Sequence, residues 1–295
     1  MRILYAMDGS PQSRHGETLA ASLFDREGVQ IDVFTVEPEI AVDAVMAGAG
    51  YQMSGLDVPV FDAETVAKEA AERLADEGFT TSWGSSKGAP AHEILSRVTG
   101  GSYDLIVMGG SHTTWMGNVL LGSVSMHVLH ESPISVLIAH AAPAGSGKVL
   151  VGVDGSKGNF AALDVITDVL DRSRCVIELS IVVGHPWVPS AVPQAGFYVG
   201  QVTAEERLEE EQRIERGREL VERCTASLRQ GGFEVQGIVL IGKPGPELLK
   251  EADSIGADLV VVGSRGLGAM RRTLLGSVSD QVVRHAPATL VARAG

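Results

Sequence analysis

The chain has 295 residues, long enough for two domains of ordinary size, and 44% of them are hydrophobic, as in globular proteins. Its net charge of −13 disfavours duplex nucleic acid and anionic membranes as partners, because both attract basic surfaces. The sequence has no apolar run that could span a bilayer, and its start, MRILYAMDGS, passes from a short strand into a turn. We therefore expect a cytoplasmic protein without a signal peptide.

Short apolar runs alternate with helical stretches along the chain, which is typical of a parallel sheet with helices on both faces. In the first half these runs predict strands near residues 2–7, 30–36, 79–84, 104–108 and 134–138. In the second half they predict strands at 149–153, 175–183, 233–240, 259–263 and 288–292. The second half also predicts helices after Ser156, over 204–230, after Pro246 and from Ser277.

The same pattern occurs twice in the sequence. Residues 88–139 align with 242–293 at a constant offset of 154, and LYAMDGS (4–10) aligns with LVGVDGS (150–156) at an offset of 146. The second copy therefore has eight extra residues in its middle, where loops tolerate insertions. We predict two α/β domains, 1–142 and 147–295, joined through the small-residue segment 141–147.

Residues 258–277, DLVVVGSRGLGAMRRTLLGS, combine a strand, a glycine-rich loop and the start of a helix. Glycines let backbone amides approach a ligand closely, and the N-terminus of a helix attracts an anion. Arg265, Arg271 and Arg272 would add positive charge there, although each one alone is also compatible with a solvated surface position. This spacing predicts a phosphate-binding loop, in which Ser277 either contacts a phosphate or caps the helix.

Asp8 and Asp154 directly follow the first strand of each half and precede Gly-Ser. In an open sheet, ligands bind outside the carboxyl ends of the strands, so each aspartate is expected to face the same crevice as the glycine loop of its half. It would accept hydrogen bonds from a sugar hydroxyl or a base amino group. The alternative is a local role in the Asp-Gly-Ser turn.

With these motifs the chain resembles the universal stress protein family in its tandem form. The resemblance rests on Gly263, Gly266 and Gly276-Ser277 at the spacing of the family's nucleotide signature, and on the run LLGSVSDQVVRHAPATLVAR near the C-terminus. It implies an α/β fold with two Rossmann-like domains, related to the adenine nucleotide alpha hydrolases. Each would have a five-stranded parallel sheet of order 3-2-1-4-5 with helices on both faces. The resemblance also implies ATP as the cofactor, with or without Mg²⁺, and a role in stress responses without a defined catalysed reaction.

The resemblance also implies roles for individual residues. It assigns Asp154 to the adenosine and the backbone near Val182 to the adenine. It assigns Gly263, Ser264, Gly266, Gly276 and Ser277 to the phosphates, next to Arg265, which the charge argument above adds. The matching positions in the first half are Asp8, Val36, Gly109, Gly110, Gly122 and Ser123.

The first half departs from this signature. His112 replaces the second glycine, and Ser111, Gly117 and Asn118 replace the three arginines. We therefore predict that the second site binds ATP more tightly than the first. A protonated His112 that donates to a phosphate is one alternative, and a packed or solvated histidine is another.

Other site classes have less support. The sequence has no P-loop motif, and no nucleophile elbow accompanies Ser111 and His112. Cys175 and Cys224 lack CxxC spacing, so packed, reduced thiols are expected. The remaining histidines lack metal-ligand spacing and are expected at the surface or at helix ends: His127, His130, His140 and His285.

The leading functional hypothesis is therefore a non-catalytic, nucleotide-dependent regulator in which ATP orders the loops at 40–60 and 184–203 for an unknown protein partner. A slow ATPase or phosphotransferase and a nucleotide-free scaffold are the alternatives. The strands at 134–138 and 288–292 are each expected at the edge of their own sheet. They would pair with each other across the repeat, giving a pseudo-twofold monomer, or with another chain in a homodimer.

Overall fold

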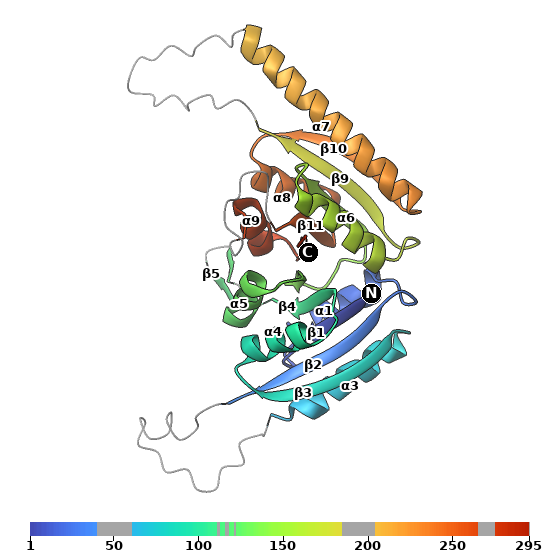
Figure 1. Ribbon diagram of the computed structural model, residues 1–295, viewed down its shortest axis with the longest axis vertical. Helices are drawn as coiled ribbons and strands as arrows, with labels where there is room; N and C mark the ends of the chain where they lie inside the picture. Colours follow the sequence, from blue (N-terminus) through green and yellow to red (C-terminus); the bar gives the residue numbers. More distant parts are fainter. Residues whose placement is uncertain are drawn as a thin grey trace, which may run out of the picture.

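The computed structural model describes residues 1–39, 61–110, 113–115, 118–120, 122–184, 204–264 and 275–294. These residues form one ten-stranded mixed sheet covered by helices (Figure 1). The predicted loop 40–60, and the predicted loop 184–203 apart from Gly184, lie outside the described residues. So do Ser111, His112, Gly117 and the segment 265–274. None of the helices in the described ranges has the length and apolar character needed to cross a membrane.

The first half supplies five strands of the large sheet and the helices between them. Its elements in chain order are β1 Arg2–Ala6, α1 His15–Leu23, β2 Gln30–Pro38, α3 Ala63–Asp76, β3 Thr80–Gly88, α4 Pro90–Gly100, β4 Leu105–Gly109, the hairpin strands β5 Thr113–Trp115 and β6 Asn118–Leu120, α5 Ser123–Glu131 and β7 Ser135–Ala139. The hairpin was not predicted, because a glycine-rich loop was expected between β4 and α5.

The second half repeats this order. Its elements are β8 Lys148–Val153, α6 Lys157–Val169, β9 Val176–Val183, α7 Ala204–Gln230, β10 Glu234–Ile241, α8 Pro244–Ile255, β11 Leu259–Gly263, α9 Ser277–His285 and β12 Ala288–Ala292. The predicted helix at 204–230 agrees with α7 at both ends, whereas α8 begins at Pro244, before the Pro246 from which it was predicted. Proline suits this first turn because its missing N–H has no helical partner there.

The strand order is β10-β9-β8-β11-β12-β7-β4-β1-β2-β3, so each half has the predicted order 3-2-1-4-5. Neighbouring strands are parallel within each half, and β12 and β7 are antiparallel. The fifth strands, β7 and β12, were predicted to pair either with each other or with another chain. In the structure they pair with each other. Main-chain hydrogen bonds between β7 and β12 make the sheet continuous, and its outer strands are β3 and β10.

Alternating side chains of each strand enter two apolar cores, one on each face of the sheet. In β1, Ile3 and Tyr5 belong to one core and Leu4 and Ala6 to the other. The first core includes residues of α1, α3, α6 and α7, and the second includes residues of α4, α5, α8 and α9. Both cores contain residues from the two halves, so each core runs across the repeat.

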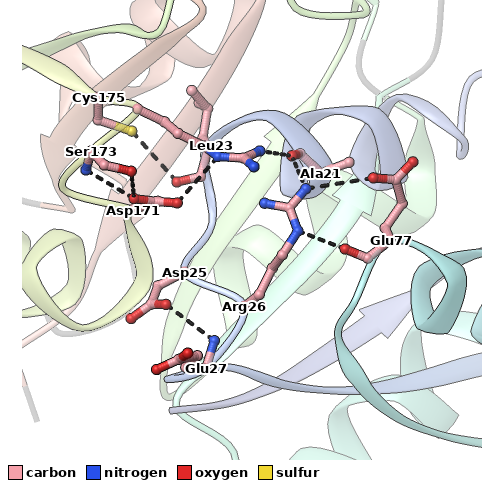
Figure 2. Close-up of polar contacts among 10 residues, drawn as sticks. Ala21, Leu23, Asp25, Arg26, Glu27, Glu77, Asp171, Ser173 and Cys175 are labelled. Carbon is pink, nitrogen blue, oxygen red and sulfur yellow. Dashed lines mark hydrogen bonds and ion pairs between the residues drawn. The ribbon is translucent and has the colours of Figure 1, made fainter.

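The halves also meet where α1 and α6 end. Phe24 and Leu170, which are equivalent at the offset of 146, form an isolated antiparallel bridge. The Asp171 amide donates to the Leu23 carbonyl at 2.8 Å. Figure 2 shows the Cys175 thiol donating to the same oxygen at 3.5 Å. Burial raises the pKa of Cys175 to about 12, so the thiol stays protonated. Cys175 and Cys224 are both buried and free, as predicted.

Candidate functional site

A cavity of about 370 Å³ opens at the carboxyl ends of the strands in the second half. Its walls come from the ends of β8, β9 and β11 and from the first turn of α9, together with side chains of α6 and α8. Five residues predicted from the sequence line this one cavity: Asp154, Val182, Gly263, Gly276 and Ser277. The topology brings them together because parallel strands end at the same edge of the sheet.

The walls of this cavity suit a flat apolar group beside a polar one. Val182, Leu248 and Val262 give it an apolar side. Asp154 is the one charged side chain among the described residues that line it. Positive potential at the other end comes from α9, whose first N–H groups have no acceptor within the helix.

Asp154 also holds the turn that leads into α6. Its Oδ1 accepts a hydrogen bond from the Ser156 amide at 2.9 Å, and Asp8 does the same for the Ser10 amide at 3.0 Å. The local turn role proposed for these aspartates is therefore present in both halves. It does not exclude ligand binding, because a carboxylate has further lone pairs that can accept hydrogen bonds.

Two predicted phosphate contacts have a different local role. The Ser264 amide donates to the Ala292 carbonyl at 2.8 Å, and the Gly276 amide donates to the Ser264 carbonyl at 2.9 Å. These two N–H groups therefore tie the loop to β12 and to itself. The N-cap of α9 is Gly276, and no side chain caps the helix, so the capping role considered for Ser277 is wrong. Ser277 is exposed at the first turn of α9 and lines the cavity.

The first half has a larger cavity, of about 860 Å³, at the corresponding place. All six residues predicted for this half line it: Asp8, Val36, Gly109, Gly110, Gly122 and Ser123. The Gly110 amide is committed to the Ala139 carbonyl at 2.7 Å, as its equivalent Ser264 is to Ala292. Arg265 and Gly266, also predicted at the second site, lie outside the described residues.

Glycine is needed at 109 and 110 for protein packing. A Cβ on Gly109 would lie 2.5 Å from the Ser13 Cα, and one on Gly110 would lie 1.9 Å from the His140 Nδ1. His140 was predicted at the surface or at a helix end, but it is buried between the halves, with its Nε2 2.8 Å from the Val283 carbonyl. That prediction was wrong because the histidine lies at the end of β7, which pairs with the other half.

Sequence reasoning missed three polar residues in the wall of the second cavity. The hydroxyl of Ser180 donates to the Val151 carbonyl, and the hydroxyl of Ser279 donates to the Gly263 carbonyl at 2.6 Å. Asn159, on the first turn of α6, is almost completely buried there. Its position five residues after Asp154, just inside a predicted helix, was the available signal.

Comparison with known proteins identifies the family. The pattern of the Universal stress protein family matches residues 1–140 and again 145–292. The chain belongs to the universal stress protein family. It has the tandem form, and the members of this family often bind nucleotides.

Relatives of the same length support this assignment. A universal stress protein of Mycolicibacterium smegmatis is 30% identical over 296 residues, which cover 96% of this chain and 94% of that protein. A universal stress protein of Mycobacterium bovis is 26% identical over 313 residues, covering 98% of this chain and 93% of that one. The crystal structure of a universal stress protein from Archaeoglobus fulgidus DSM 4304 has the same fold, with a TM-score of 0.67 and 23% identity over 100% of this chain and 98% of that chain.

Proposed function

We propose that this universal stress protein binds ATP in the cavity of its second half and acts as a nucleotide-dependent regulator of the stress response. The observation that carries the proposal is the convergence of Asp154, Val182 and the first turn of α9 on one cavity. Strand order separates these groups, with β9 on one side of β8 and β11 on the other. A nucleotide lying across the three strand ends would place its base near Val182 and its phosphates near α9.

The chemistry of each wall supports this orientation. Apolar side chains of β9, β11 and α8 offer contact to a purine ring, while an uncapped helix N-terminus stabilises phosphate charge. Arg265, Arg271 and Arg272, adjacent to this helix in sequence, would strengthen phosphate binding. ATP is therefore proposed as the ligand, with Mg²⁺ carried by its phosphates.

We favour a regulator over an enzyme because the described walls hold few groups for hydrolysis. Phosphoryl transfer needs a placed base or water-orienting group and acidic ligands for magnesium. Asp154 is the single carboxylate lining the second cavity among the described residues, and those residues hold no cluster of three metal-ligating side chains. Bound ATP would instead change a surface that another protein reads.

Calorimetric titration of the full chain with ATP tests the proposal. The variants Asp154→Ala and Asp8→Ala are compared with wild type as a matched pair, one in each half. Both substitutions remove the same turn contact, so any difference between them reports on ligand binding. We expect one strong site per chain. Asp154→Ala should weaken it about ten- to hundredfold, because a hydrogen bond to a charged group contributes about 1.5–3 kcal/mol. Asp8→Ala should leave the strong site unchanged.

The alternatives give other results. Equal effects of the two substitutions would contradict the assignment of the strong site to the second half. Release of ADP with measurable turnover would favour the ATPase. A purified chain that carries no nucleotide by mass spectrometry and gives no heat with ATP would favour the scaffold.

A further inference from the structure

We infer that Asn159 binds the sugar of the ligand in the second cavity, with its side-chain amide donating a hydrogen bond to a ribose hydroxyl oxygen. This inference rests on the proposed binding of ATP there. Asn159 lines the cavity and is 2% exposed. Its Nδ2 has no hydrogen-bond partner in the protein.

A buried amide without a partner is unusual, because nearly all buried polar groups in folded proteins have one. The neighbouring polar side chains do not satisfy it. Neither the hydroxyls of Ser180 and Ser279, which donate to main-chain carbonyls, nor the Asp154 carboxylate accepts a hydrogen bond from this amide. The side-chain amide of Asn159 is therefore a donor without an acceptor in the described wall of the cavity. An acceptor atom on a bound ligand would satisfy it.

Topology indicates which part of a nucleotide supplies that acceptor. The strand order is β9-β8-β11, with Val182 near the end of β9 and the phosphate-side loop after β11. Asp154 and Asn159 follow β8, and β8 lies between β9 and β11 in the sheet. In a nucleotide the sugar lies between base and phosphate, so it would lie over the end of β8. There a hydroxyl can donate to the Asp154 carboxylate and accept from the Asn159 amide at the same time.

The first half lacks this donor. Ser13 occupies the position equivalent to Asn159 at the offset of 146, and it is also buried. Its hydroxyl donates to the Ser10 carbonyl at 2.8 Å, and its amide donates to the Ser10 hydroxyl at 3.1 Å. Ser13 is thus committed to its own turn. The chain itself therefore provides a matched control position.

A thermodynamic cycle in which one change lies in the ligand tests the inference. The full-length wild type, Asn159→Ala and Ser13→Ala are titrated by calorimetry with ATP, 2′-deoxy-ATP and 3′-deoxy-ATP. We expect wild type and Ser13→Ala to bind ATP about two- to tenfold more tightly than one of the deoxy analogues. This ratio corresponds to the free energy that one hydrogen bond contributes to binding. In Asn159→Ala that preference should become smaller, because ATP weakens while the analogue does not; the hydrogen bond from the hydroxyl to Asp154 remains.

Thermal unfolding without nucleotide separates this role from a structural one. Because the amide is unpartnered, Asn159→Ala is expected to unfold at the wild-type temperature or above it. ATP binding by Asn159→Ala with wild-type affinity and preference would overturn the inference and leave the proposed function intact. An equal loss for ATP and both analogues would also overturn it. A wild-type chain that binds none of the three would refute the proposed function together with the inference.

Discussion

The carboxyl groups of Asp32 and Glu178 occupy equivalent positions in the two halves but have opposite surroundings. Asp32 accepts hydrogen bonds from Tyr103 and, at 2.8 Å, from Arg97. At the offset of 154, the position of Arg97 corresponds to Glu251. Glu178 keeps one neutral donor, Gln236, at 2.5 Å. One half thus has an ion pair where the other has two carboxyl groups.

These surroundings shift the two pKa values in opposite directions. Burial would raise the pKa of Asp32, but the bonds from Tyr103 and Arg97 outweigh it, so the pKa is lowered. Burial raises the pKa of Glu178, the bond from Gln236 opposes this, and the charge of Glu251 raises it further. Lys148, the charged group on the adjacent strand, opposes the rise. The first half therefore favours the charged form of its carboxyl group, and the second favours the neutral form.

The two residues should contribute to stability with opposite pH dependence. A lowered pKa stabilises the fold above the usual aspartate pKa of 3.8, and this contribution is lost as the pH falls through the folded value. A raised pKa means that the folded state holds a proton that the unfolded chain has released, so stability falls as the pH rises above 4.5. Glu178→Gln should therefore increase the free energy of unfolding over that of wild type at pH 7. The increase should be smaller at pH 4.5.

Urea denaturation at the two pH values measures this difference, with Asp32→Asn as the matched variant. Asp32→Asn should destabilise the protein at pH 7 by about 2 kcal/mol, since it removes hydrogen bonds to a charged group. Loss of stability at pH 7 in Glu178→Gln, or an unchanged pH dependence, would show that the fold does not raise the pKa of Glu178.

At the scale of elements, α7 approaches the sheet closely at one glycine. A Cβ on Gly237 of β10 would lie 2.3 Å from the Val221 Cγ1 and 2.9 Å from the Thr225 Oγ1, both on α7. The equivalent residue in the first half is Trp83, which is exposed on β3. The close contact is therefore specific to the long helix of the second half and is not part of the repeat.

Gly237→Ala should therefore destabilise the protein. The added methyl group must displace a β-branched side chain in a packed interface, which costs about 1–3 kcal/mol. Gly100→Ala is the control, because a Cβ there meets no atom within 4 Å and alanine favours the helix in which Gly100 lies. Urea midpoints of the two variants give the comparison. Equal midpoints would mean that α7 moves away from β10 at little cost.

Local patterns in the sequence were sufficient to predict most elements. Apolar runs bounded by glycine gave the strands, and periodic apolar positions such as Val221 and Leu228 gave α7. The repeat and the family resemblance together gave the strand order. These signals work because burial acts on each segment through its own periodicity.

The remaining features depend on groups that are distant in sequence. The commitment of the Gly276 amide to Ser264 and the burial of His140 between the halves both arise from tertiary pairing. The same holds for Asn159, whose burial depends on how α6 packs over β11. For the candidate site, sequence therefore predicted the residues that gather at the cavity, but not which of their donors remain available to a ligand.

At the scale of the whole molecule, the repeat is fused into one structure. β7 and β12 pair through their main chains, with Leu137 opposite Leu290, and both leucines are fully buried. The bridge between Phe24 and Leu170 adds a second contact at equivalent positions. Separation of the halves would expose two apolar strand edges, so neither half is expected to unfold without affecting the other.

Leu105 and Leu259 provide a matched pair to test this coupling. They are equivalent at the offset of 154, begin β4 and β11, and are both fully buried in the same core. Each substitution to alanine should cost about 2–5 kcal/mol of unfolding free energy. Because the core and sheet are continuous, either one should reduce hydrogen-exchange protection in both β1 and β8. If Leu259→Ala affects β8 and leaves β1 protected, while Leu105→Ala does the reverse, the halves unfold independently. A ligand bound in one half would then have no route through the fold to stabilise the other.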